Sequence, residues 1–421
     1  MHKLRTSSGR ELWYDVNTNR ISQWTQQMSH EAYPVVHFKE SHECKMDQIS
    51  MFTIEITQQC NLRCSYCCYS GAYRDRRKHN PQEISYEILD KTIEFILNHM
   101  DANSDEISVC FYGGEALIAK NKIQYLINKL DLTLGDRVTY SLSTNGYALS
   151  QPIVDWICEH EKFLVNITID GNQTMHDAHR QTLDGRGSFQ TIIKNLTYFK
   201  YSYPEQYDQR VRFLSTVYTL DEINSLSQVW DTIDVLKGKL PIHISQIIPN
   251  FDDSHRIYDS IATKDDFYSK AFEDYKSGID SIRSLYFKKL IYLIEGRPLS
   301  SIPDELNIIT CYQDLFSCFI NVYGDIYACE KFCDEYSIGN VKTGFDKIKM
   351  INILHLFAER KNKYCQSCWA QRFCRMCLTG LNHTENEIER MCDMERDTIE
   401  IALKYFCEKT DWDQANKLSN H

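Results

Sequence analysis

The feature that most constrains the fold is a regular alternation of short apolar runs with amphipathic segments between residues 51 and 250. Six runs have the length and composition of buried strands: 51–57, 107–112, 138–143, 163–169, 211–217 and 242–248. Between them, segments such as 86–100, 120–130 and 151–160 carry apolar residues at helical spacing. Strands that alternate with helices form βα units around a parallel sheet. The pattern therefore predicts an α/β fold.

Chemically active side chains follow four of these strands. They are the cysteines of the segment Cys60–Cys67, the turn Gly113-Gly114-Glu115, the turn Ser143-Thr144-Asn145-Gly146, and the pair Asp170-Gly171. Ligands of parallel sheets bind at the carboxyl ends of the strands. We therefore expect these groups to meet at one edge of the sheet.

Cysteine is unusually abundant, with 17 residues in 421. The first residues lack the apolar run of a signal peptide, and nowhere do about eighteen apolar residues run together. We therefore expect a cytoplasmic protein that neither spans nor enters a membrane. In that compartment clustered cysteines are metal ligands or catalysts more often than disulfides. The net charge of −11 argues against nucleic acid as a partner.

The first cysteine group has the spacing C-x3-C-x2-C, formed by Cys60, Cys64 and Cys67 directly after a predicted strand. Three thiolates can hold three corners of a four-iron cluster and leave one iron open for another ligand. A zinc site would need a fourth ligand, for which Cys68 and His79 are the candidates nearby. Because Cys67 and Cys68 are adjacent, they can hardly both bind one zinc ion.

This motif, with Tyr66 before the third cysteine, resembles the signature of radical S-adenosylmethionine (radical SAM) enzymes. The resemblance implies a partial (β/α)6 barrel of the TIM type. It also implies that the open iron binds the amino and carboxylate groups of S-adenosylmethionine, whose reductive cleavage yields a 5′-deoxyadenosyl radical.

The same resemblance implies which residues contact the cofactor. Family members place a Gly-Gly-Glu turn after the second strand to bind the methionyl amino group, a polar turn after the third strand, and a ribose contact at the fourth. The residues implied here are Tyr66, Gly113, Gly114, Glu115, Ser143, Asn145, Thr168, Asp170 and Arg180. Alternatives remain for two of them, because Glu115 could simply begin a helix and Arg180 could form a surface salt bridge. No general base is predicted.

A second cysteine group begins at Cys311 and contains the core C-x2-C-x5-C-x2-C, for which zinc sites are the first alternative. Its order resembles the SPASM extension of radical SAM peptide maturases, which carries two auxiliary [4Fe–4S] clusters. The resemblance assigns Cys311, Cys318, Cys329 and Cys377 to one cluster and Cys365, Cys368, Cys374 and Cys392 to the other. The spacing between Cys374 and Cys377 is one residue shorter than usual in the family, which weakens the assignment of Cys377 as a cluster ligand. Cys333 is extra and could replace Cys311.

Four segments are expected along the chain. Residues 1–50 form an extension with a small hairpin, in which 11–14 and 20–24 flank a polar turn. Residues 51–250 form the radical SAM barrel, 251–310 a helical linker, and 311–421 the SPASM domain with the auxiliary clusters.

The sequence thus predicts a radical SAM/SPASM oxidoreductase with three [4Fe–4S] clusters, which cross-links a ribosomally synthesised precursor peptide through a thioether or carbon–carbon bond. An auxiliary cluster could accept the second electron that such a product loses. The resemblance also implies an electron donor such as flavodoxin or ferredoxin. Two alternatives stay open: a maturase of a folded protein, such as the sulfatase-activating enzymes, and a zinc-binding interaction protein without catalysis.

Overall fold

The structure is a computed structural model of the 421-residue chain. It describes residues 1–23, 33–39, 46, 48–71, 77–247, 259–307, 311, 315–332 and 334–419, except for the side chains of 307 and 416–419. Trp24, Ile248 and Cys333, on which parts of the sequence predictions rest, lie outside these residues.

The chain divides into two compact units. We call the first the sheet unit; it consists of His42–Arg256 and Thr310–Ile353. The second, here the helical unit, consists of Met1–Ser41, Ile257–Ile309 and Leu354–His421. The four segments expected from the sequence stay a prediction, since they follow the chain order whereas each unit gathers distant parts of the chain.

The sheet unit is built on parallel strands that appear in the order β12-β11-β9-β8-β7-β5-β14, followed by the antiparallel β15, β16 and β17. The strands are β5 (Met51–Thr57), β7 (Ile107–Gly113), β8 (Val138–Thr144), β9 (Phe163–Thr168), β11 (Val211–Val217), β12 (His243–Gln246), β14 (Ser317–Ile320), β15 (Asp325–Tyr327), β16 (Gly339–Asn340) and β17 (Gly344–Phe345). The expected α/β class with a parallel sheet is confirmed, and β5 and β11 have the predicted bounds.

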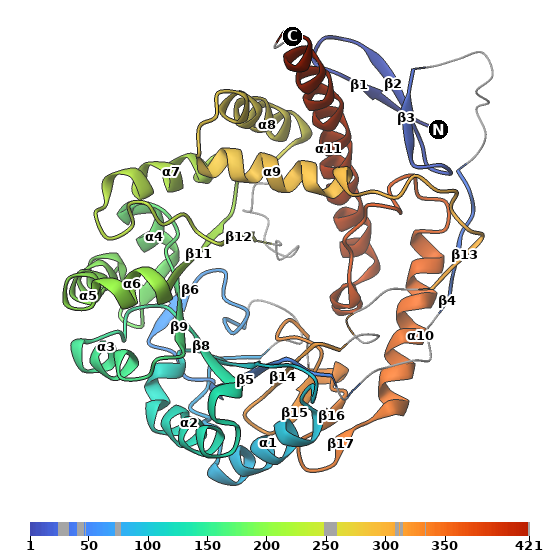
Figure 1. Ribbon diagram of the computed structural model, residues 1–421. Coiled ribbons are helices and arrows are strands. Elements are labelled where there is room, and N and C mark those ends of the chain that lie inside the picture. The colour runs from blue at the N-terminus through green and yellow to red at the C-terminus, as the bar shows by residue number, and fades with distance from the viewer. Residues whose placement is uncertain are drawn as a thin grey trace. The chain divides into compact units, whose positions relative to one another are not determined.

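Helices connect the parallel strands and cover one face of the sheet (Figure 1). They are α1 (Tyr86–His99), α2 (Lys120–Leu134), α3 (Gln151–Cys158), α4 (Gln173–His179), α5 (Phe189–Ser202), α6 (Pro204–Arg210) and α7 (Glu222–Thr232). In α1, the Ser85 hydroxyl caps the first turn by accepting from the amide of Ile88, and the buried face includes Leu89, Ile93 and Ile96. Such caps and apolar faces explain why the helical segments are visible in the sequence.

One connection differs from the rest because it forms a small second sheet. The short strands β6 (Leu62–Cys64) and β10 (Arg180–Thr182) pair antiparallel, and Arg180 lies opposite Cys64. The segment after β9 is thereby tied to the loop after β5. Periodicity does not reveal this pairing, because each strand has three residues.

The helical unit contains α8 (Ile261–Lys276), α9 (Ile282–Glu295) and α11 (Glu385–Ser419), which pack against one another. Its first residues form the expected hairpin, β2 (Glu11–Asp15) with β3 (Arg20–Ser22), and β1 (His2–Arg5) adds a third strand. β4 (His37–Lys39) pairs with β13 (Glu305–Asn307), and α10 (Lys347–Tyr364) continues the chain into this unit. Among the described residues, no helix combines the length and the apolar run needed to cross a bilayer.

Candidate functional site

The loop after β5 carries the first cysteine group. Cys60 lies three residues after the end of β5, Cys64 ends β6, and Cys67 lies in the next turn. The amides of Leu62 and Tyr69 donate hydrogen bonds to the sulfurs of Cys60 and Cys67, each at 3.4 Å. Burial raises the pKa of the Cys60 thiol to about 11. A metal must therefore displace protons from buried thiols, and the amide donors can stabilise the thiolates that result.

The Gly-Gly-Glu turn lies directly against this loop. The amide of Gly114 donates to the carbonyl of Thr57 at 2.9 Å, and the amide of Glu115 donates to the carbonyl of Gln59 at 2.8 Å. A Cβ on Gly114 would lie 2.1 Å from that Gln59 oxygen, and Gly113 has φ +140°. Only glycine allows this approach of the two backbones.

Glu115 is fully buried, and its carboxylate joins three segments. It accepts from the amide of Leu117, where it caps a short 3₁₀ helix, and from the hydroxyl of Thr144 and the amide of Asn145 at the end of β8. Burial raises the pKa of this carboxyl group against the lowering effect of those hydrogen bonds. The alternative that Glu115 begins a helix is therefore correct as a description of its position. Since a carboxylate offers about four acceptor sites, these three donors leave room for one more.

Asn145 brings the third strand to the first cysteine. Its side-chain amide lies 3.6 Å from the Cys60 sulfur and 2.7 Å from the side-chain oxygen of Asn61. Ser143 instead hydrogen-bonds with the thiol of Cys110 on β7. Thr168 ends β9, as expected, and is half-buried. Both keep their predicted places at strand ends.

Asp170, Tyr66 and Arg180 form a buried network beside Cys64. The Tyr66 hydroxyl donates to Asp170, and Nη1 of Arg180 donates to that hydroxyl at 2.6 Å. Asp170 also accepts from the amide of Thr216 on β11. Arg180 is only 4% exposed, so the alternative of a surface salt bridge is wrong. Among the described residues, its Nε has no hydrogen-bond partner, which leaves a buried cationic donor for an anionic group.

In the sheet unit, the β14–β15 hairpin carries two cysteines of the second group. Cys318 lies one residue before the paired residue Phe319, and Cys329 lies two residues after its partner Tyr327. The hairpin therefore brings both cysteines to the end opposite its turn. Burial raises the pKa of the Cys318 thiol. Cys311 belongs to the same unit, whereas Cys377, the fourth ligand assigned to this cluster, belongs to the helical unit.

The helical unit contains the four cysteines assigned to the other cluster. Burial raises the pKa of Cys365 to about 12, and negative charge on Cys374, Cys392 and Cys368 as thiolates adds to this effect. Cys377 is exposed, and its thiol hydrogen-bonds with the Thr379 hydroxyl at 3.0 Å. The set assigned to one auxiliary cluster is therefore gathered in a single unit.

The donor chemistry of both groups fits iron–sulfur clusters, because all these ligands are thiols and several lie beside amide or cationic donors. Within the described ranges, no three His, Cys, Asp or Glu side chains are arranged to hold a single metal ion. The ligand sets therefore stay predictions.

Two buried polar residues were given no role from the sequence. Thr144 holds the Glu115 carboxylate, although it was named only as a member of its turn and only its neighbours Ser143 and Asn145 were assigned to the cofactor. Glu55 lies outside the cofactor-contacting residues; it is the one charged residue in the run Met51–Thr57, and it is completely buried. The charge inside an apolar strand was the available signal for Glu55.

Comparison with known proteins agrees with this geometry. The model of the radical SAM superfamily matches residues 54–206, and the model of the SPASM iron–sulfur cluster-binding domain matches residues 311–369. The chain therefore contains a radical SAM domain and a SPASM domain. It is a radical SAM/SPASM enzyme, and these domains imply S-adenosylmethionine, a [4Fe–4S] cluster that binds it, and auxiliary clusters.

Its relatives include enzymes with different substrates. The cysteine-type anaerobic sulfatase-maturating enzyme of Clostridium novyi is 26% identical over 353 residues, which cover 80% of this chain and 88% of that one. The subtilosin biosynthesis protein AlbA of Bacillus subtilis is 23% identical over 81% of this chain and 70% of its own. The cyclopropyl synthase TigE of Paramaledivibacter caminithermalis is 25% identical over 56% of this chain and 48% of its own.

A solved structure of similar fold is that of native anSMEcpe with bound AdoMet. Its TM-score is 0.63 at 21% identity, and the match covers 86% of this chain and 99% of that one. At this identity the likeness shows the radical SAM fold alone.

The Gly-Gly-Glu turn gives a direct test of the site. We expect Gly114→Ala to destabilise the enzyme by at least about 1–3 kcal/mol, because the new methyl group would overlap the Gln59 carbonyl next to Cys60. The midpoint temperature of thermal unfolding and the iron content should both decrease. Gly296→Ala is the control, since a Cβ there meets no atom within 4 Å. Equal stability of the two variants would contradict the close approach.

Proposed function

We propose that this radical SAM/SPASM enzyme installs a thioether or carbon–carbon cross-link in a ribosomally synthesised precursor peptide. The observation that carries the proposal is the presence in one chain of two thiol sets. The Cys60–Cys67 loop lies at the strand ends of the sheet unit, and a second set lies in the helical unit. Two relatives support it, since AlbA is named for the biosynthesis of the bacteriocin subtilosin and TigE is named as a radical SAM cyclopropyl synthase.

When bound, the cluster and S-adenosylmethionine would supply the radical chemistry that removes hydrogen from an unactivated C–H bond. The protein's own residues bind and orient the cofactor. We propose that Arg180 pairs with the cofactor carboxylate through its free Nε, and that the open acceptor site of Glu115 receives the ammonium group. Burial of both residues keeps water from these contacts.

We further propose that the enzyme works in the cytosol with a flavodoxin- or ferredoxin-type electron donor. Every described cysteine is free of disulfide bonds, which supports a reducing compartment. The acidic net charge of −11 gives no support to nucleic acid as a partner.

A second candidate is the oxidation of a cysteine or serine in a folded protein. It is favoured by the similarity to sulfatase-maturating enzymes, which extends over 80% of the chain. Both candidates use the same cofactor site, so they differ in the substrate and in the product that forms from it.

The test is anaerobic incubation of the reconstituted enzyme with S-adenosylmethionine, a reductant and two substrates in parallel. One substrate is a short precursor peptide encoded beside the gene, and the other is a sulfatase-derived peptide with its target cysteine. We expect the precursor to lose two hydrogen atoms and to resist fragmentation between the linked residues in tandem mass spectrometry. A hydrazine-reactive aldehyde in the sulfatase peptide alone would favour the second candidate. The triple Cys60, Cys64 and Cys67 to Ala variant is the inactive control.

A further inference from the structure

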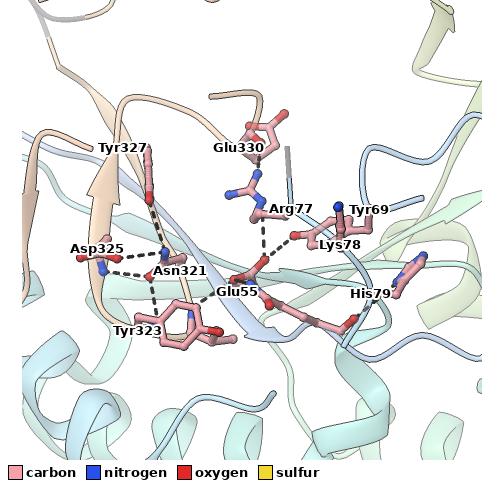
Figure 2. Close-up of polar contacts among 12 residues, drawn as sticks. Glu55, Tyr69, Arg77, Lys78, His79, Asn321, Tyr323, Asp325, Tyr327 and Glu330 are labelled. Atoms are coloured by element: carbon pink, nitrogen blue, oxygen red, sulfur yellow. Dashed lines mark hydrogen bonds and ion pairs between the residues drawn. The ribbon is translucent and has the colours of Figure 1, made fainter. Parts of the chain in front are cut away.

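The sheet unit contains a buried ion pair that the cofactor site does not use. Glu55 and Arg77 have side chains that are 0% and 5% exposed, and Nε of Arg77 lies 3.8 Å from Oε1 of Glu55 (Figure 2). A buried charge is costly unless it is paired and hydrogen-bonded, and such a pair is seldom kept for stability alone. The contacts of the pair show which segments it holds together.

Glu55 joins two segments that carry cysteines. On the side of the first cysteine group, it accepts from the Tyr69 hydroxyl and from the side-chain amide of Gln58 at 2.9 Å. Gln58 precedes Cys60 by two residues, and Tyr69 follows Cys67 by two residues. Glu55 also accepts a hydrogen bond at 3.1 Å from the amide of Val322, which lies in the turn of the β14–β15 hairpin.

The hairpin turn presents that amide in a fixed direction. The side-chain oxygen of Asn321 accepts from the amides of Tyr323 and Asp325, both at 2.9 Å. Figure 2 shows this turn beside the Glu55 carboxylate. Because the same hairpin carries Cys318 and Cys329, Glu55 fixes both predicted cluster-binding segments to one strand.

Arg77 extends the pair toward the hairpin cysteines. Its Nη2 donates to the carbonyl of Glu330, the residue after Cys329, and its guanidinium lies 4.4 Å from the ring centre of Phe319, the residue after Cys318. Its Nη1 has no hydrogen-bond partner in the part of the chain that the structure describes. The Nε edge of the cation thus faces Glu55, while its other end contacts both neighbours of the hairpin cysteines.

We infer that Arg77 is a positioning residue that raises the reduction potential of the auxiliary cluster predicted at Cys318 and Cys329, with Glu55 holding it in place. Glu55 faces the Nε edge of the cation, whereas the opposite end of the guanidinium lies beside the hairpin cysteines and would favour the reduced, more negative cluster, because charge and hydrogen bonding set such potentials. A higher potential helps this cluster to accept an electron from the substrate. The inference rests on the proposed auxiliary ligands but not on the identity of the peptide product.

The test compares three variants of the full enzyme after anaerobic reconstitution. Arg77→Gln removes the charge and keeps a hydrogen-bond donor, whereas Arg77→Lys keeps the charge. Arg186→Gln is the control, because it removes an arginine that is 76% exposed in the same unit. Iron content, cofactor cleavage and the midpoint potential of each cluster are measured, the last by titration monitored with electron paramagnetic resonance.

We expect Arg77→Gln to keep its iron and its basal cofactor cleavage, and to lower the potential of one auxiliary cluster. A tenfold lower equilibrium constant for its reduction corresponds to about 59 mV for one electron. Arg77→Lys should lower the potential by at most half as much as Arg77→Gln does. Arg186→Gln should leave the potential unchanged. Product formed per cofactor cleaved should fall with the potential.

An unchanged potential in Arg77→Gln with full iron would overturn the inference. So would loss of iron from both Arg77 variants, because Arg77 would then be purely structural. If Arg77→Gln alone loses iron, the double variant Glu55→Gln/Arg77→Gln, which leaves no unpaired buried charge, must keep its iron and show the lower potential for the inference to stand. A wild-type enzyme with iron for only one cluster would contradict the auxiliary ligands themselves, which is a separate failure.

Discussion

Replacement of Cys60, Cys64 and Cys67 with alanine should abolish the formation of 5′-deoxyadenosine from S-adenosylmethionine. These thiols lie on one short loop after β5, and the structure offers amide donors to two of their sulfurs. With all three removed, Cys68 is the one thiol left in this loop, and a single thiol cannot hold the cluster. Because three four-iron clusters are expected, iron should fall by about one third. Anaerobic iron analysis and chromatography of the nucleoside product measure both effects.

The control for this triple variant is Cys158→Ala, which removes a half-buried thiol at the end of α3 far along the chain from either cysteine group. It should keep full iron and full cleavage. Cofactor cleavage that persists in the triple variant would end the assignment of this loop as the catalytic cluster site.

Replacement of Cys365 and Cys368 with alanine should abolish peptide modification while cofactor cleavage continues. Both thiols are neighbours of Cys374 and Cys392 in the helical unit, whereas the cofactor-binding loop belongs to the sheet unit. The variant should lose about one cluster of iron. Its soluble yield should also fall, since small metal-rich segments depend on their metal for folding.

Cys407→Ala serves as the matched control, because Cys407 is a buried cysteine of the same unit that is not assigned to a cluster. It should retain product formation and iron. Mass spectrometry of the peptide and chromatography of 5′-deoxyadenosine separate the two activities. Full peptide modification by the double variant would mean that the second cysteine group is not needed for the reaction.

The strands and the first cysteine motif could be predicted because their signals are local. The bounds of β5 and β11 match the predicted strands, because apolar residues recur along each of these seven-residue segments. The spacing of Cys60, Cys64 and Cys67 is likewise contained in eight consecutive residues. The family resemblance added the expected roles of Glu115 and Arg180 toward the cofactor. The sequence alone does not indicate that these two residues lie in the same site.

What the sequence by itself determined is therefore the α/β class, the strand positions and the residues that can bind metal. The tertiary structure decided which polar groups meet. Glu115 contacts Thr144 because β7 and β8 are adjacent. Arg180 contacts Tyr66 because β10 pairs with β6. Glu55 accepts from the amide of Val322, 267 residues away in the chain, because β14 pairs with β5. Periodicity reports the face that a residue occupies, but a buried polar group needs a partner in space, and that partner is set by strand order.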